Sequence, residues 1–147
     1  MHIFELFLNE MSDNEYQIFS RKAIEEFKAS GIELVLTRHV ADQVAYNTER
    51  GSMVTPQIFI ETLRSILKAF NERKLGKYIY MAGKKPEAHA LFRHKFQGTD
   101  GKINIANVPC AIAKIKTPPF MFKFTIITFM VKDNYQNDNF PDSPMIV

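Results

Sequence analysis

A histidine followed by polar residues at helical spacing is the first feature of this sequence that could do chemistry. His39 is followed by Asp42, Gln43 and Tyr46, three, four and seven residues later. In a helix, this spacing places the four side chains on one face. Because a histidine exchanges a proton near neutral pH, His39 is a candidate general base or acid. The alternative is a surface or capping histidine with no chemical role.

A second group of basic residues lies in the middle of the chain. His89, Arg93 and Lys95 stand at alternating positions, so in a strand they share one face and His94 points to the other. Phosphodiester cleavage needs a proton carrier and fixed positive charge beside the developing phosphorane, and these residue types supply both. The alternative is a basic strand face turned to solvent.

Four more residues are candidates for substrate binding. Arg50 and the pair Lys84 and Lys85 could hold phosphates, and Tyr80 could stack on a base. The alternatives are lysines that are merely exposed at a turn, and aromatic side chains that pack within a sheet.

Several classes of chemistry lack their motifs. The sequence contains no glycine-rich nucleotide-binding motif, no serine-hydrolase elbow and no His-Glu-x-x-His, and its four histidines lack metal-ligand spacing. Cys110 is the single cysteine, which excludes an internal disulfide and fits a reducing compartment. We therefore expect no metal and no cofactor.

The charge of the chain is unevenly distributed. The net charge is +3, yet residues 64–95 carry nine Lys or Arg against two Asp or Glu, and residues 1–33 carry three against seven. A basic centre of this kind indicates a polyanion as partner, while the alternative is a solvated basic surface. There is no apolar run long enough to span a membrane, so no membrane partner is expected.

The elements that must position these residues follow from periodicity and capping. A short helix over 3–8 and a helix over 13–30, with the Ser12–Glu15 capping box, are predicted first. Two later helices are predicted to begin after Thr37 and Thr55, as N-cap residues. Strands are expected at 32–37, 78–81, 88–96, 103–108, 111–116 and 120–131, the last of them central in the sheet. An extended lead-in is the alternative for 32–37 and a helix for 88–96, and Pro109 is expected to break the chain between 103–108 and 111–116.

The order of these elements predicts an α+β fold, with N-terminal helices packed on a mainly antiparallel sheet of four to five strands. At 147 residues, the chain is expected to form a single domain. Within it we expect N-terminal helices over 1–33, an α+β core over 34–131 and an irregular tail over 132–147.

Some of these segments resemble a known family. The segments Leu36-Thr37-Arg38-His39, Arg50-Gly51 and Val54-Thr55-Pro56, together with the late strand 124–130, are similar to the barnase–EndoU–colicin–RelE superfamily. The similarity is greatest to phage-encoded members and RegB-type small endoribonucleases. It implies a RelE-like core, a metal-independent endoribonuclease that leaves a 2′,3′-cyclic phosphate, and site roles for His39 and Arg50. Gln43 stands where members of the family carry a basic residue.

Two functions are therefore expected from the sequence. In the first, a phage endoribonuclease or degenerate RNA-binding relative, His39 deprotonates the 2′-hydroxyl and His89 protonates the leaving oxygen, while Arg50, Arg93 and Lys95 hold the phosphate. The alternative is a non-enzymatic phage virion protein of the head, neck or tail, or a binder of a host protein. The expected location is the host cytoplasm or the virion.

Overall fold

The computed structural model describes residues 3–40, 55–98, 101–133, 135, 140 and 144–147, and for residues 3–14 it describes the backbone. Three helices are present in these ranges: α1 (Ile3–Ala29), α3 (Pro56–Asn71) and α4 (Gly76–Lys84). Six strands accompany them, namely β1 (Ile32–Leu36), β2 (Ala88–Gln97), β3 (Ile103–Lys114), β4 (Phe122–Ile126), β5 (Met130–Val131) and β6 (Met145–Ile146).

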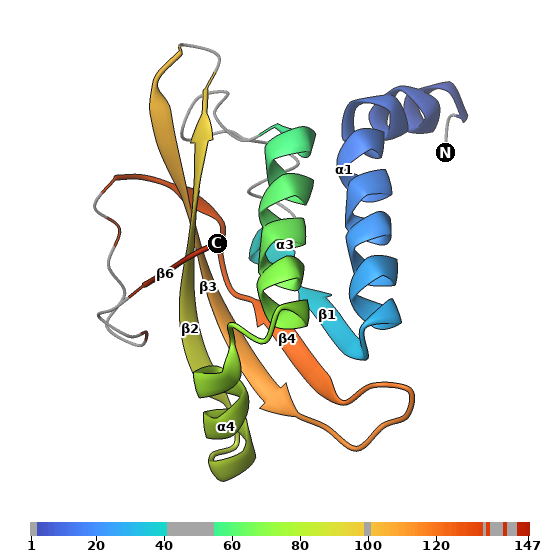
Figure 1. Ribbon diagram of the computed structural model, residues 1–147. Helices are drawn as coiled ribbons and strands as arrows, with labels where there is room; N and C mark the ends of the chain where they lie inside the picture. Colours follow the sequence, from blue (N-terminus) through green and yellow to red (C-terminus); the bar gives the residue numbers. More distant parts are fainter. Residues whose placement is uncertain (1–2, 41–54, 99–100, 134, 136–139, 141–143) are drawn as a thin grey trace.

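The strands form one mixed sheet in the order β1-β4-β3-β2-β6, with β5 paired to β3 beyond the end of β4. The β2–β3, β3–β4 and β3–β5 pairs are antiparallel, whereas β1–β4 and β2–β6 are parallel. Figure 1 shows α1 and α3 on one face of this sheet, with α4 at its lower end. The predicted α+β class is confirmed, although the sheet has six strands rather than four or five.

Aromatic side chains join the helices to the sheet. Phe124 is fully buried on β4, and its ring meets the rings of Phe27 on α1 and Phe70 on α3 at 6.2 and 5.8 Å between centroids. Phe59 on α3 meets Phe129 in the same edge-to-face manner at 5.6 Å. Such pairs add to the free energy gained by burying large apolar surfaces, so this layer stabilises the packing of the helices on the sheet.

Three local predictions are confirmed. Thr55 caps α3, since its hydroxyl accepts a hydrogen bond from the Ile58 N–H at 3.2 Å, and Pro56 occupies the first turn. Thr37 caps the helical turn at 38–40 by accepting from the Val40 N–H at 3.3 Å. Gly31 ends the first helix with a φ of 79°, which favours glycine.

The N-terminal prediction of two helices is wrong. The backbone is one continuous helix, α1, through the proposed boundary at Ser12. No glycine or proline occurs before Gly31, so nothing in residues 3–29 breaks the helix.

The predicted strand at 78–81 is also wrong, because these residues lie within α4. The alternation of aromatic and aliphatic residues favoured a strand. In the structure, Tyr78 and Ala82 are the buried positions, four residues apart, and the Tyr78 ring packs on Phe92 of β2 at 6.1 Å. Burial therefore follows the helical period.

The predicted break at Pro109 is absent, since β3 runs through it as one strand. The Pro109 carbonyl accepts a hydrogen bond from the Ile127 N–H at 3.0 Å, and Ile127 lies between β4 and β5. Because the nitrogen and carbonyl of a strand residue point to the same side, the proline nitrogen, which has no hydrogen to donate, also faces this gap. In that gap the partner chain has one extra residue, because Cys110 pairs with Ile126 and Asn107 pairs with Met130. This β-bulge lets a proline sit inside the sheet.

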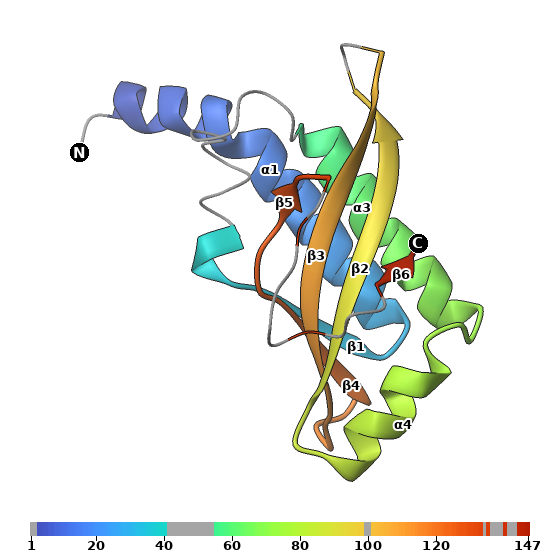
Figure 2. The same ribbon diagram turned by 90° about the vertical axis from the view of Figure 1, so that its left-hand side faces the viewer.

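The same bulge corrects the expectation for residues 120–131. They form β4 and β5 rather than one strand, and the centre of the sheet is β3. The expected irregular tail likewise ends in a strand, because β6 pairs with Phe92 and Arg93 at the outer edge of β2. Figure 2 shows β6 beside β2 in this position.

Candidate nucleic-acid interface

The exposed face of α4 brings together basic and aromatic side chains. Tyr78 and Ala82 anchor the helix to the sheet, which leaves Lys77, Tyr80 and Lys84 on the solvent side at spacings of three and four residues. Tyr80 is 66% exposed, which is the largest exposed fraction of any large hydrophobic side chain in the part of the chain that the structure describes. We call Lys77, Tyr80, Lys84 and the following Lys85 the α4 face.

Cations and aromatic rings are in contact on this helix. The Lys84 ammonium lies 5.6 Å from the centroid of the Tyr80 ring, and the Lys77 ammonium lies 5.9 Å from the Tyr78 ring. These are cation–π distances, so the lysines stay close to the helix rather than extending freely into water. Positive charge and an accessible ring are therefore held side by side.

The acidic residues nearest in sequence are paired with other groups. Residues 73–86 contain five Lys or Arg and no Asp or Glu. Glu72 bonds to Lys74 at 3.1 Å, and Glu87 bonds to His89 at 2.9 Å. Among the ion pairs of the described residues, none involves Lys77, Lys84 or Lys85. The positive charge of the α4 face is therefore available to a ligand.

The basic surface continues onto the end of the sheet. Lys114 is exposed where β3 ends, and Figure 1 shows this end of β3 near α4 at the bottom of the molecule. Helix α4 packs on β3 and β2. A strand of nucleic acid bound along α4 would therefore meet further positive charge beyond it.

His39 lies elsewhere. It is exposed in the helical turn that Thr37 caps, directly after β1. The hydroxyl of Thr37 also donates to the Ile127 carbonyl at 3.2 Å, which ties this turn to the bulge between β4 and β5. The polar residues expected to share its face, Asp42, Gln43 and Tyr46, lie outside the described residues, as does Arg50.

His89 and Arg93 share the sheet face away from α1 and α3, as the alternation predicted. His89 contacts Glu87, and its ring lies 5.0 Å from the Phe140 ring. Arg93 donates from Nε to Asn107 at 3.0 Å and from Nη2 to the Tyr135 carbonyl at 2.8 Å. The Arg93 guanidinium therefore holds the C-terminal segment against the sheet, while Lys95 on the same strand is exposed.

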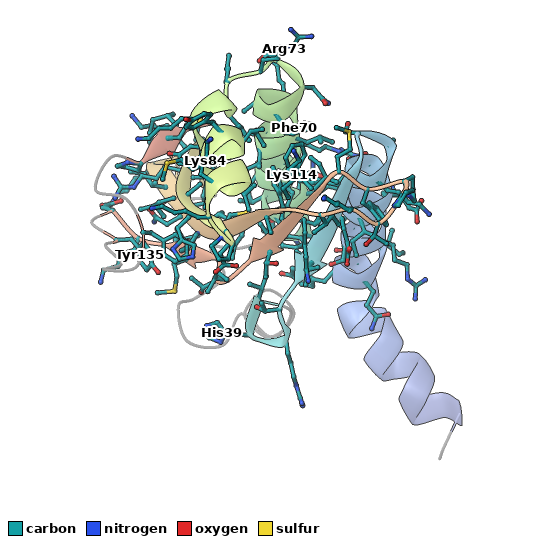
Figure 3. The ribbon with its side chains drawn as sticks, turned by 90° about the horizontal axis from the view of Figure 1, so that it is seen from below. His39, Phe70, Arg73, Lys84, Lys114 and Tyr135 are labelled. Atoms are coloured by element: carbon teal, nitrogen blue, oxygen red, sulfur yellow. The ribbon has the colours of Figure 1, made fainter. Side chains whose placement is uncertain are left out.

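The sheet register separates His39 from these residues. Leu36 on β1 pairs with Ile126 on β4, Ile126 pairs with Cys110 on β3, and Cys110 pairs with Ala90 on β2. Strands β1 and β2 are therefore three strand spacings apart, or about 14 Å. Figure 3 likewise shows His39 well away from Lys84 and Tyr135. The structure thus brings together Tyr80, Lys84 and Lys85, and separately His89 and Arg93, but does not bring His39 to either group.

Two residues are not singled out by the sequence. A strand over 78–81 does not group Lys77 with Tyr80 and Lys84, whereas the helix α4 places the three on one face. Asn107 is fully buried and bonds to Arg93 and to the carbonyls of Met130 and Lys132. A lone asparagine within a strand pattern gives no sign of such a role.

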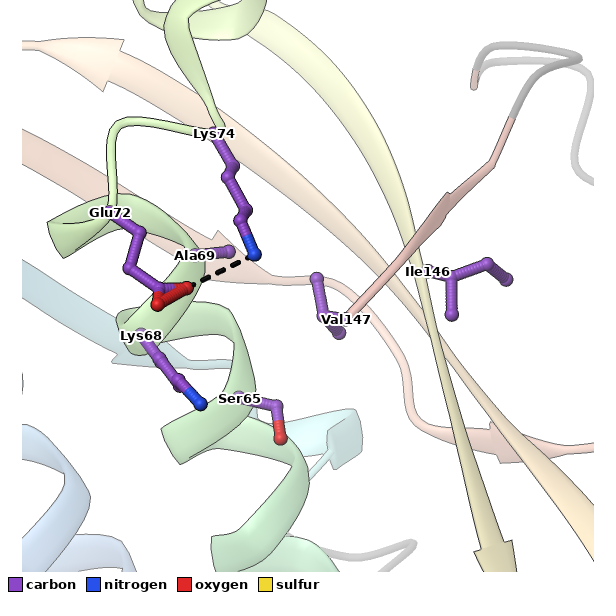
Figure 4. Close-up of a pocket in the computed structure, with 7 residues that line it drawn as sticks. All are labelled: Ser65, Lys68, Ala69, Glu72, Lys74, Ile146 and Val147. Atoms are coloured by element: carbon purple, nitrogen blue, oxygen red, sulfur yellow. Dashed lines mark ion pairs between the residues drawn. The ribbon is translucent and has the colours of Figure 1, made fainter.

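A shallow cavity of about 190 Å³ lies between α3 and the C-terminal strand. Figure 4 shows Ser65, Lys68 and Glu72 on one side and Ile146 and Val147 on the other. The cavity contains none of the residues predicted as a site. Within the described part of the chain, no group of His, Cys, Asp and Glu is arranged to hold a metal, and no helix is long and apolar enough to cross a membrane.

Comparison with known proteins gives no relative. No family model matches the chain, and neither a curated protein nor a solved structure is significantly similar to it.

Proposed function

We propose that this protein binds single-stranded RNA through the α4 face, as a binding module. The observation that carries the proposal is the 66% exposed Tyr80 with the Lys84 ammonium 5.6 Å from the centroid of its ring, on a helix that also carries Lys77 and is followed by Lys85. Proteins that bind single strands combine stacking platforms with positive charge that follows the phosphates. The α4 face has both.

The dimensions of the helix suit a short stretch of nucleic acid. Lys77 and Lys84 are seven residues apart, so their backbones are separated by about 10 Å along the helix axis. A base stacked on Tyr80, midway between them, would have its neighbouring phosphates within reach of both lysine side chains. Lys85 adds charge at the end where α4 meets β2.

The choice of RNA has a separate basis. The α4 face offers contacts to phosphates and to base faces, which DNA also possesses. The segment around His39 resembles endoribonucleases, and this favours RNA as the partner. Contacts to the 2′-hydroxyl would distinguish the two.

The test is the affinity of the full chain for a labelled single-stranded RNA of mixed sequence, by fluorescence anisotropy at several salt concentrations. We expect binding that weakens steeply with salt, with a slope of about 0.7 in log–log form for each phosphate contacted. The combined variant Lys77→Ala/Lys84→Ala should lower both the affinity and the slope. The double variant Lys22→Ala/Lys28→Ala, on α1, is the charge-matched control.

The proposal fails if the α1 control loses as much affinity as the α4 variant, or if the wild type does not bind RNA at low salt. The same oligonucleotide as DNA shows whether the 2′-hydroxyl contributes. Incubation with RNA in excess EDTA, followed by mapping of the product ends, tests for cleavage. Cyclic-phosphate ends that vanish in His39→Ala would add an endoribonuclease activity to the binding function.

A further inference from the structure

The N-terminal turns of α1 project from the rest of the molecule. Figures 1 and 2 both show them extending beyond the described part of the sheet and beyond α3. We call residues 3–14 the N-terminal arm. The rest of α1 packs on α3 and β1.

The sequence of the arm is acidic and amphipathic. It contains Glu5, Glu10 and Asp13, and the chain has no Lys or Arg before Arg21. Apolar residues recur at helical spacing, three or four positions apart: Ile3, Phe4, Phe7, Leu8 and Met11. A sequence of this kind is typical of a helix that docks on a partner through its apolar residues.

The arm and the α4 face have opposite charge and lie at opposite ends of the molecule. Figure 1 places the start of α1 in the upper part of the molecule and α4 at the bottom. Helix α1 has 27 residues and therefore follows a path of about 40 Å. The arm consequently cannot reach the α4 face of its own chain, but it can reach that of another copy.

We propose that the N-terminal arm of one copy docks on the α4 face of a second copy. The apolar stripe of the arm would cover Tyr80, and its carboxylates would meet Lys77, Lys84 and Lys85, which have no ion-pair partner among the described residues. Such a head-to-tail contact leaves one arm and one α4 face open in every dimer, so it extends into chains. Pairing of two arms is disfavoured because it would bring like charges together.

This assembly would also compete with RNA for the α4 face. The competition rests on the proposed RNA-binding function, whereas the assembly itself does not. A docked arm covers Tyr80 and neutralises the lysines that would hold phosphates. RNA should therefore disperse the assembly, and the assembly should lower the apparent affinity for RNA.

The test uses two charge-reversal variants of the full chain in analytical ultracentrifugation at low salt. The arm variant carries Glu5→Lys, Glu10→Lys and Asp13→Lys, and the α4 variant carries Lys77→Glu and Lys84→Glu. Wild type should form species larger than a dimer as its concentration rises, and each variant alone should be monomeric. Mixed in equal amounts, the two variants should again form species larger than a dimer. The lysines of the reversed arm then meet the glutamates of the reversed face, and the unchanged acidic arm meets the unchanged lysines, so both contacts are restored.

Three results would overturn the proposal: a monomeric wild type at every concentration, assembly of either variant alone, or a mixture that stays monomeric while wild type assembles. Neutral versions with Gln at the same positions, checked by circular dichroism, replace any variant that does not fold, and their mixture should stop at a dimer, because only one acidic arm and one basic α4 face remain. The neutral arm variant, which adds no lysine, should bind RNA as tightly as monomeric wild type. If the mixture assembles but no form binds RNA, the assembly stands and the proposed function falls.

Discussion

Arg93 and Asn107 face each other across β2 and β3, and the Arg93 Nε donates to the Asn107 Oδ1 at 3.0 Å. The Arg93 Nη2 continues to the Tyr135 carbonyl at 2.8 Å. One guanidinium thus joins two strands to the C-terminal segment. The residue types that indicated phosphate binding in the sequence are here engaged by the protein itself.

Replacing Arg93 is therefore expected to lower stability. Arg93→Ala should reduce the free energy of unfolding by about 1.5–3 kcal/mol, since hydrogen bonds made by a charged group are lost. Arg93→Lys should not restore it, because an ammonium lacks the planar fork that reaches both partners. Urea unfolding measures the change, with the exposed Lys95→Ala as control. Lower RNA affinity in folded Arg93→Ala would instead place this sheet face in the binding site.

Asn107 should be equally important to the C-terminal half. Its Nδ2 donates to the Lys132 carbonyl at 2.7 Å and to the Met130 carbonyl at 3.0 Å, and the residue is fully buried. Asn107→Asp keeps the shape but loses these donors and places a carboxylate beside two carbonyls. We expect a loss of at least about 1–3 kcal/mol in urea unfolding. Asn104→Asp, on the same strand and more exposed, should change stability little.

Tyr80 tests the proposed stacking. Tyr80→Ala should weaken binding of single-stranded RNA by about 1–3 kcal/mol, which is the usual value of one base stacked on an aromatic ring. Tyr80→Phe keeps the ring and should retain most of the affinity. Anisotropy titrations at fixed salt measure both. Equal losses in the two variants would show that the hydroxyl, rather than the ring face, is recognised.

Tyr78 should make stability depend on alkaline pH. Burial raises the pKa of Tyr78 above its ordinary value of 10.0, so the unfolded phenol loses its proton at a lower pH than the folded one. The contribution of Tyr78 to the free energy of unfolding is therefore complete below a pH of about 10, and it declines as the pH rises above the pKa of the unfolded phenol. The stability difference between wild type and Tyr78→Phe, measured by urea unfolding at neutral pH and again at alkaline pH, should therefore shift in favour of the variant. A difference that stays constant with pH would contradict the assignment.

Cys110 should be unreactive in the native protein. It is fully buried on β3, and burial raises the pKa of its thiol, so both access and thiolate are lacking. A thiol reagent should label one group per chain in concentrated guanidinium chloride and almost none in native buffer. Cys110→Ser combined with Thr117→Cys, at an exposed position, is the reactive control. Rapid labelling of native wild type would indicate that β3 opens readily.

The sequence by itself determined the elements whose signals are local. A threonine hydroxyl satisfies a free N–H at the start of a helix whatever the rest of the chain does, so Thr37 and Thr55 could be recognised as caps. Gly31 could be recognised because a left-handed residue is costly for other side chains. The alternation in β2 likewise gave the strand and the shared face of His89 and Arg93. Residue type alone also singled out Lys84, Lys85 and Tyr80, and their role in binding stays a prediction.

Only the tertiary structure decided how these pieces meet. The sequence of residues 78–81 is compatible with a strand or with a helix. Packing of the Tyr78 ring on Phe92 selects the helix, and the helix gathers Lys77, Tyr80 and Lys84 on one face. Pro109 stays in β3 only because the extra residue between β4 and β5 lies opposite it. Arg93 bonds to Tyr135, which is 42 positions away in the chain. Such contacts depend on which distant segments pack together, and local spacing carries no information about that.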